Sequence, residues 1–269
     1  MSARVLTLAG GRKVALAEWG EGKPLLYLHD FADIHGVGAE PFEFHTRLAA
    51  RFKVMAPAHP GCAGSDEDEE VDTIEDVVFG LLEVLDALKL ESVPVVGTGL
   101  GGWIAAELAV RQRRLVEKLA LVSPTGLFLP GAPIADIFMV SQPRDGYDHA
   151  DLRRLLFART DSKPALELFP NGRAALEPEL LRYKMFRFAG RVGFNPPYLH
   201  HRLLQGRLGR FDRPALILAG ERNALVPMAH ARAYAEKLPN AKLVTFADAG
   251  HSLHLEQPKE AAEAILKFL

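Results

Sequence analysis

Ser92–Val110, which reads SVPVVGTGLGGWIAAELAV, is the stretch that decides the fold of this chain. It opens with an apolar run suited to a buried strand, passes through closely spaced glycines, and ends in alanines and leucines typical of a packed helix. A strand, a tight turn and a helix in this order aim the turn residue and the first helical N–H groups at one point. The stretch therefore predicts a functional site at its turn.

Two kinds of site share this local geometry. Gly97, Gly99 and Gly102 match the dinucleotide-binding pattern G-x-G-x-x-G. Gly97–Gly101 matches the nucleophile elbow G-x-S-x-G, except that Gly99 stands where the serine should be. A dinucleotide site also needs an acidic residue at the end of the next strand, and that strand ends at Ser123 without one. We therefore favour the elbow and expect no cofactor.

Composition excludes several classes of function. A chain of 269 residues suffices for one large domain with an insertion or for two small domains. The formal net charge of -2 gives no signal for nucleic acid. The single cysteine excludes an internal disulfide and suits a reducing compartment. The N-terminal segment lacks a signal-peptide apolar region, and no stretch resembles a membrane span. We expect a cytoplasmic protein that binds neither nucleic acid nor membranes.

Strand and helix patterns alternate on both sides of the glycine turn. Strands are expected at residues 4–8, 13–18, 24–28, 52–57, 116–122, 215–219 and 242–246, and helices at 41–50, 73–89, 227–237 and 258–268. This alternation predicts a mostly parallel sheet covered on both faces. From 124 to 209 it gives way to helical segments, at 151–159, 178–188 and 197–205, among proline and glycine turns. We therefore expect an α/β core at residues 1–123 and 210–269, with a helical cap at residues 124–209.

Four further segments carry a resemblance, in the order of the chain, to the α/β-hydrolase fold superfamily. Leu28–Phe31, LHDF, resembles the family's H-G-x segment, and Ala58–Asp66, AHPGCAGSD, resembles its D-x-P-G-x-G-x-S-D loop. Gly220–Pro227, GERNALVP, resembles its G-x-x-D-x-x-V-P loop, and Ala249–Pro258, AGHSLHLEQP, resembles its G-H-x-x-x-x-E-x-P loop. The resemblance covers nearly the whole chain and is strongest to capped, single-domain members. It implies an α/β-hydrolase sheet with an inserted helical cap.

The chemistry of that family needs a nucleophile, a histidine, an acid that orients the histidine, and backbone N–H groups that hold an oxyanion. The resemblance implies that His251 is the histidine and that the N–H groups of Phe31 and Leu100 form the oxyanion hole. Asn223 stands at the acid position and Gly99 at the nucleophile position. Gly99 has no side chain and cannot attack a substrate, although glycine relieves the backbone strain of an elbow.

The polar residues around this expected site also depart from the family pattern. We expect Asn223 to accept a hydrogen bond from the His251 ring, but an amide cannot stabilise an imidazolium as a carboxylate would. Asp30 stands where the family has glycine, and its charge should repel an oxyanion; His59 stands where the family has aspartate. With His29 they are expected to form a polar group at the pocket mouth. Asp30 and His59 could instead form an ion pair. We expect no metal, because the histidines lack ligand spacing.

A displaced nucleophile is the remaining route to a covalent mechanism. Thr98 is one step from the elbow position, so its side chain should point away from the site. Cys62 is expected to be a small buried filler, with a reactive thiol as the alternative. Ser123 ends the strand beside the elbow strand, and a hydroxyl bonded to the backbone is favoured there over a nucleophile.

Charged residues elsewhere add one hypothesis about the ligand. The cap is basic, and one or two of Arg182, Arg187, Arg191 and Arg202 could reach an anionic ligand, although most should be solvated. The acidic run Asp66–Glu70 is expected to be a solvated loop.

Three functions from different classes stay open. In the first, His251 acts as a general base or proton shuttle on a small carbonyl-containing substrate polarised by Leu100 and Phe31; the resemblance allows this because the family contains lyases, cyclases and cofactor-free oxygenases. In the second, the chain is a pseudoenzyme that binds a small molecule without chemistry. In the third, it is a hydrolase with a displaced nucleophile or an activated water. The expected partner is a small molecule under the cap, and an exposed cap edge could support a homodimer.

Overall fold

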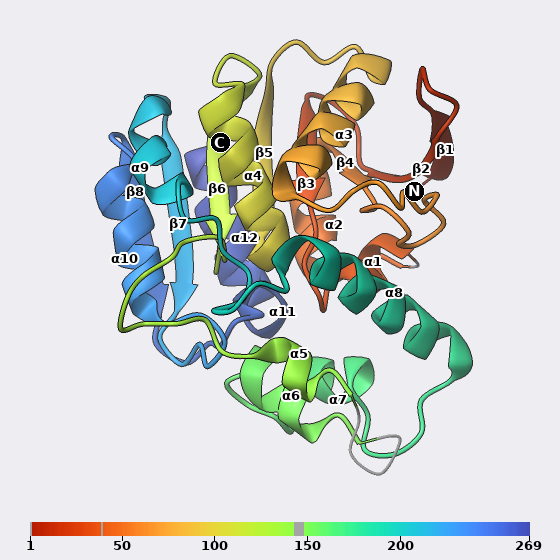
Figure 1. The fold of residues 1–269 in the computed structure, drawn as a ribbon, viewed down its shortest axis with the longest axis vertical. Coiled ribbons are helices and arrows are strands. Elements are labelled where there is room, and N and C mark those ends of the chain that lie inside the picture. The colour runs from red at the N-terminus through yellow and green to blue at the C-terminus, as the bar shows by residue number, and fades with distance from the viewer. Residues whose placement is uncertain (1, 39, 143–147) are drawn as a thin grey trace.

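A computed structural model describes residues 2–38, 40–142 and 148–269. Across these residues, eight strands form one sheet in the order β1-β2-β4-β3-β5-β6-β7-β8 (Figure 1). In chain order the strands are β1 Ser2–Thr7, β2 Lys13–Trp19, β3 Pro24–Leu28, β4 Lys53–Pro57, β5 Val93–Thr98, β6 Val116–Val122, β7 Ala215–Gly220 and β8 Ala241–Phe246. Only the pairs β1–β2 and β2–β4 are antiparallel. The predicted α/β fold with a mostly parallel sheet is confirmed.

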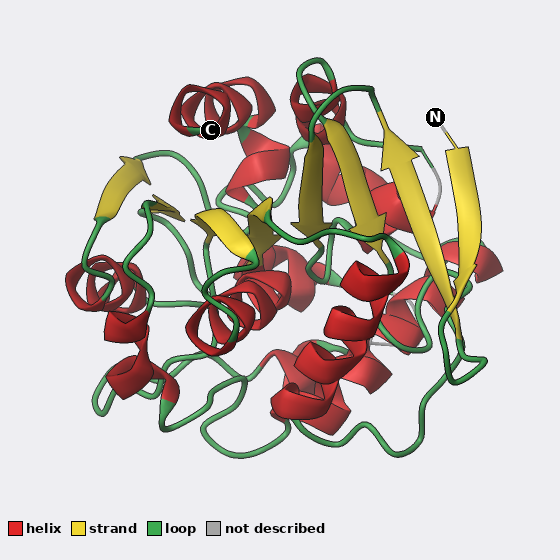
Figure 2. Cartoon of the chain, turned by 90° about the horizontal axis from the view of Figure 1, so that it is seen from above, coloured by secondary structure: helices red, strands yellow, loops and turns green. Residues whose placement is uncertain are grey.

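Helices cover both faces of the sheet, as Figure 2 shows from above. Outside the segment between β6 and β7 they are α1 Ile34–Gly38, α2 Glu43–Ala49, α3 Ile74–Ala87, α4 Gly99–Arg111, α10 Met228–Lys237, α11 Leu253–Glu256 and α12 Pro258–Phe268. Covered on both faces, β5 and β7 are buried along their whole length, which explains their continuous apolar sequences. A capping box fixes the start of α3, where Thr73 Oγ1 accepts from the Asp76 N–H and the Asp76 carboxylate accepts from the Thr73 N–H.

The segment between β6 and β7 is helical in its described part. It contains α5 Ile137–Val140, α6 Ala150–Leu156, α7 Lys163–Leu168, α8 Leu176–Gly193, α9 Leu204–Arg207 and a 3-10 turn at Leu208–Arg210. Figure 1 shows α5 to α8 beyond the carboxyl end of β7. The helix expected at 197–205 is wrong except for its last residues, because Pro196 and Pro197 cannot donate the N–H bonds of a helix. No helix in the described parts of the chain combines the length and apolarity needed to cross a bilayer.

The acidic run Asp66–Glu70 is a largely exposed loop, as expected, and α8 contacts it. Arg187 of α8 donates to Glu67 at 2.7 Å, and Arg191 donates to the backbone carbonyl of Asp68 at 2.9 Å. A partly exposed ion pair such as Arg187–Glu67 contributes about 1 kcal/mol or less, so these two contacts orient α8 against the core more than they stabilise it. They also mean that both arginines are engaged within the protein.

Candidate active site

The elbow forms where β5 meets α4. Gly99 is the first residue of α4 and has a φ of 44°, in the left-handed region that favours glycine. A Cβ built on Gly101 would overlap the Leu28 carbonyl of β3, so glycine at this position lets α4 lie directly against the sheet. The first N–H groups of α4 therefore open at the carboxyl ends of β3 and β5, as the elbow interpretation requires.

The space that a side chain at Gly99 would fill is occupied by the Asp30 carboxyl group. A Cβ built on Gly99 would overlap the carboxyl carbon and both carboxyl oxygens of Asp30. Asp30 Oδ1 accepts the Leu100 N–H at 2.8 Å, which is the donor that the family resemblance assigned to an oxyanion. In this conformation the Leu100 N–H is thus not free for a substrate. Asp30 supplies the negative charge that this donor stabilises.

His251 lies on the other side of the same carboxylate. Its Nε2 is 2.9 Å from Asp30 Oδ2, and its Nδ1 is 3.3 Å from Asn223 Nδ2. The Asn223 amide oxygen accepts the backbone N–H groups of Leu225 and Val226 at 3.1 and 2.9 Å. Those two donors fix the orientation of the amide, so its NH₂ group faces the ring. The expectation that Asn223 accepts a bond from His251 is therefore wrong; it donates one to Nδ1.

This arrangement reverses the tautomer of a serine-hydrolase histidine. In a triad the acid holds the proton on Nδ1, and Nε2 is free to take the proton of the nucleophile. Here Nδ1 accepts from Asn223, which leaves the proton on Nε2, where it is donated to Asp30. His251 is thus arranged as a proton donor to a carboxylate.

Asp33 holds Asp30 in position, and the sequence analysis did not give it this role. Asp33 Oδ1 accepts the Asp30 N–H at 2.7 Å, and Oδ2 accepts the hydroxyl groups of Thr98, at 2.9 Å, and Tyr27. Burial acts to raise the pKa of the Asp33 carboxyl, but the hydrogen bond and charge of His254, together with His29 and His45, hold that pKa well below its usual range. An acid three residues after Asp30 was the available sequence signal, since such side chains often bond a nearby backbone N–H.

His29 and His59 bind each other, and the alternative ion pair between Asp30 and His59 does not form. The His59 N–H donates to His29 Nε2 at 3.2 Å, and His59 Nε2 lies 3.0 Å from the His29 carbonyl oxygen. Burial lowers the pKa of both imidazoles, so both are neutral at pH 7. His29 Nδ1 lies 3.2 Å from the backbone carbonyl oxygen of Asp30. The polar group expected at the pocket mouth is thus two separate pairs, in which Asp30 binds His251 and His59 binds His29.

Helix α8 contacts the loop that carries Asp30. Phe31 stacks on Phe186 of α8 with ring centroids 5.2 Å apart and an interplanar angle of 18°. The side chains of Asp30 and His251 are 1% and 0% exposed. A ligand could therefore reach this pair only if neighbouring side chains moved.

Of the other nucleophile candidates, Thr98 and Cys62 do not take over the role of serine. The Thr98 hydroxyl contacts the Leu28 carbonyl and Asp33, away from the elbow opening. Cys62 is buried with Sγ 3.9 Å from the Met185 sulfur, and burial raises its pKa to about 12, which suits a filler. The expectation that the Ser123 hydroxyl bonds the backbone is wrong. The hydroxyl is buried without a hydrogen-bond partner in the described structure, at a residue with a φ of 47°.

Arg182 does not reach toward the candidate site for an anion either. It is buried inside the cap, where its guanidinium donates to His149 Nε2 at 2.8 Å and to the Leu168 carbonyl at 2.7 Å. Arg202 lies over the ring of Phe128, 4.3 Å from its centroid. These arginines, like the two that bind the acidic run, are engaged within the protein.

Comparison with known proteins agrees with this fold. Residues 34–264 match the profile of the alpha/beta hydrolase family, and the chain belongs to that family. It is 31% identical over 260 residues to a pimeloyl-[acyl-carrier protein] methyl ester esterase of Chromobacterium violaceum, with 93% of this chain and 95% of the relative covered. It is 25% identical to a 2-hydroxymuconate semialdehyde hydrolase of Pseudomonas sp. strain CF600, with 97% and 92% covered. The esterase EaEST from Exiguobacterium antarcticum shares the fold, with a TM-score of 0.78 at 17% identity over 99% of both chains.

Proposed function

We propose that this member of the family is a proton-transfer catalyst that acts through Asp30 and His251 on a small carbonyl-containing substrate. The observation that carries the proposal is the Asp30 carboxylate in the space of the missing nucleophile, 2.9 Å from His251 Nε2. A carboxylate and an imidazole at hydrogen-bond distance are a general acid–base pair. Gly99 excludes an acyl-enzyme on the elbow itself.

The chemistry follows from the groups that hold the carboxylate. A substrate carbonyl that displaces Asp30 Oδ1 would accept the Leu100 N–H, which stabilises negative charge on its oxygen. The freed carboxylate takes a proton from the substrate carbon or from an attacking water. The protonated Asp30 then returns that proton to the substrate oxygen or leaving group, while neutral His251 keeps its Nε2 proton and donates it as a hydrogen bond, so the cycle has no net proton change.

A pocket in the cap supports access for such a substrate. It holds about 310 Å³ and is lined in part by Glu179, Leu180, Tyr183 and Phe186 of α8. Phe186 is also the ring that covers Phe31, so rotation of this side chain would join the pocket to the elbow. We therefore propose that the substrate lies under the cap.

Binding without chemistry is the second candidate, and one observation favours it. Asp30, His251 and Asn223 satisfy one another and the Leu100 N–H in a buried network, so the resting site is complete without a ligand. In a pseudoenzyme this network would fix the loop whose Phe31 stacks on Phe186 of the pocket lining.

The test compares the wild type with Asp30→Asn, His251→Ala and Ser123→Ala. Solvent deuterium incorporation into small ketones and aldehydes is followed by NMR, together with hydrolysis of p-nitrophenyl esters and labelling by a fluorophosphonate. We expect an unlabelled wild type whose activity falls about 100-fold or more in the first two variants and is unchanged in Ser123→Ala.

Two outcomes would overturn the proposal. Fluorophosphonate labelling that disappears in Ser123→Ala would make the chain a serine hydrolase with a displaced nucleophile. Saturable binding of these carbonyl compounds without turnover, with affinity merely altered in His251→Ala, would make it a binding protein.

A further inference from the structure

Helix α8 of the cap carries an apolar stripe that the described parts of the chain leave largely uncovered. Leu176, Leu180 and Tyr183 are 82%, 48% and 59% exposed, and they follow one another at steps of four and three residues. At about 3.6 residues per turn, these steps place the three side chains on one line along the helix. Met185 and Phe188 are buried on the other side of α8, so the stripe faces away from the protein.

The stripe is more than a wall of the cap pocket. Leu176, Leu180 and Tyr183 do line part of that pocket. A side chain that serves only to line a concave site is mostly covered by its neighbours, whereas Leu176 and Tyr183 keep more than half of their surface exposed. Large apolar side chains that are exposed next to one another mark a contact surface. The stripe therefore fits a partner that lies across the helix.

Two charged residues on one side of the stripe indicate which partner this is. Glu177 is exposed and Lys184 is half-buried, and neither forms an ion pair within the described ranges. They are seven residues apart, which is about two turns, so they lie on the same side of α8. Glu179, Arg182 and Arg187 are already paired inside the protein. The free charges beside the stripe are thus an acid near its start and a base near its end.

Such a surface is complementary to itself when it is turned end to end. A two-fold axis beside Leu180 places a second α8 antiparallel to the first, and each Leu180 then meets its equivalent. Glu177 lies three residues before Leu180 and Lys184 four residues after it. The rotation keeps each flank of the stripe on its own side, so Glu177 of each copy comes beside Lys184 of the other. The helix dipoles also run in opposite directions, which favours this pairing.

We propose that the chain forms a two-fold symmetric homodimer in which the stripes of two α8 helices pack antiparallel. Burial of the stripe supplies the affinity, and the two symmetry-related pairs of Glu177 with Lys184 set the orientation. Because Leu180 and Tyr183 also line the cap pocket, the second copy would form part of its outer wall. The proposal does not depend on the proton-transfer chemistry at the elbow.

Analytical ultracentrifugation of the full chain between about 1 and 200 µM tests the dimer. One helix pair makes a small interface, so we expect a dissociation constant of about 1–100 µM. Leu180→Asp sets two carboxylates against each other at the axis and should leave a monomer at every concentration. Leu176→Asp, at a more exposed position of the same stripe, replaces it if that variant does not fold.

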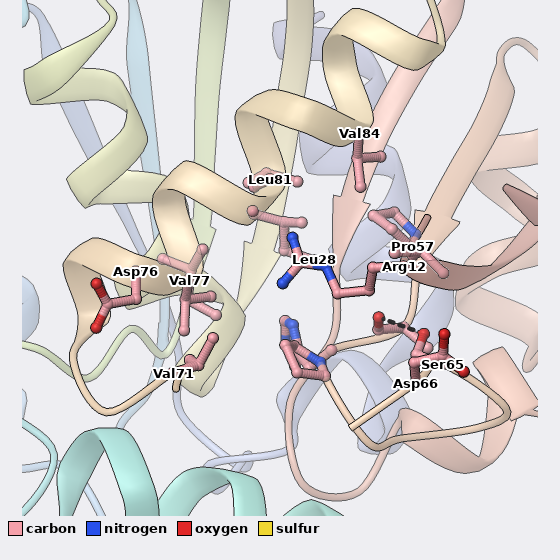
Figure 3. A pocket seen from close by; sticks show the side chains of 16 residues that line it. Arg12, Leu28, Pro57, Ser65, Asp66, Val71, Asp76, Val77, Leu81 and Val84 are labelled. Atoms are coloured by element: carbon pink, nitrogen blue, oxygen red, sulfur yellow. Dashed lines mark hydrogen bonds between the residues drawn. The ribbon is translucent and has the colours of Figure 1, made fainter. Parts of the chain in front are cut away.

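Helix α3 supplies the matched control. Figure 3 shows Val77, Leu81 and Val84 on the face of α3 that is turned toward the protein. Phe79 of the same helix is 70% exposed. Phe79→Asp therefore makes the same kind of change as Leu180→Asp on another exposed apolar residue, and should leave the dissociation constant unchanged.

Exchange of the two charges tests the orientation. Glu177→Lys and Lys184→Glu each bring like charges together twice in the dimer, and each should raise the dissociation constant about tenfold. The double variant Glu177→Lys/Lys184→Glu restores opposite charges and should return the constant close to that of the wild type.

Three results would overturn the proposal. A wild type that stays monomeric at 200 µM would exclude the dimer. A dimer that survives Leu180→Asp, or that Phe79→Asp weakens equally, would exclude the stripe as its interface. A double charge variant that associates no more tightly than the two single variants would exclude the antiparallel arrangement.

Discussion

Restoring the missing serine tests the position of Asp30 most directly. Because the Asp30 carboxyl group occupies the space of a Gly99 side chain, Gly99→Ser alone cannot rebuild a serine-hydrolase elbow. The serine would have to expel the carboxylate from the Leu100 N–H and from His251. Removing the carboxylate at the same time, in Asp30→Gly/Gly99→Ser, vacates both the space and the N–H donor.

The size of the effect follows from the contacts that are lost. A hydrogen bond to a charged group contributes about 1.5–3 kcal/mol, and the Asp30 carboxylate makes two, so expelling it costs about 3–6 kcal/mol. Holding serine in the left-handed region at residue 99 adds about 1–2 kcal/mol. Gly99→Ser alone should therefore lower the free energy of unfolding by about 4–8 kcal/mol, a large part of the total for an ordinary domain. The double variant lacks the same two hydrogen bonds, but it has no carboxylate that the serine must expel, so it should be more stable than the single variant.

Urea denaturation followed by tryptophan fluorescence measures the free energy of unfolding of each variant, since Trp19 and Trp103 are both buried. Fluorophosphonate labelling measures activation of the serine. It should appear when Asn223→Asp, which lets Nδ1 carry the ring proton and frees Nε2 as an acceptor, is added to the double variant, but not in Gly99→Ser. Asp30→Gly alone is the control for the loss of the carboxylate. A Gly99→Ser protein as stable as the wild type, or labelled as strongly as that triple variant, would refute the placement of Asp30.

Three further predictions follow from contacts at the site. Nitrogen-15 NMR of the wild type should find the His251 proton on Nε2. Asn223→Asp should move the proton to Nδ1, because a carboxylate there accepts rather than donates. A proton on Nδ1 in the wild type would contradict the assigned orientation of the Asn223 amide. Glu256 accepts the Gly250 N–H at 2.6 Å and so holds the loop before His251. We expect Glu256→Ala to lower the free energy of unfolding, measured by urea denaturation, by about 1–3 kcal/mol. Glu256→Gln, which keeps an acceptor oxygen, should be closer to the wild type. Since burial raises the pKa of Cys62 to about 12, the native protein at pH 8 should resist a thiol reagent that modifies the urea-unfolded chain at once, and rapid native labelling would contradict this.

The sequence by itself determined the features that depend on local pattern. Alternating strands and helices predicted the parallel sheet, since each element must bury an apolar face. The apolar run before Gly97 and the glycines after it located the elbow, and the loss of a side chain at Gly99 follows from the identity of the residue alone. His251 and Asn223 were found in the same way, and the structure brings both to the elbow.

Tertiary structure alone decided what these residues do to one another. Asp30 and Gly99 lie far apart in the chain, and only the packing of the loop after β3 against the start of α4 puts a carboxylate where the serine is missing. The direction of the hydrogen bond between Asn223 and His251 depends on two backbone N–H groups that bind the other end of the amide. Sequence pattern reports which groups are present, whereas the partner of a buried polar group is set by three-dimensional contacts, because each donor and acceptor must be satisfied by whatever the fold brings within about 3 Å.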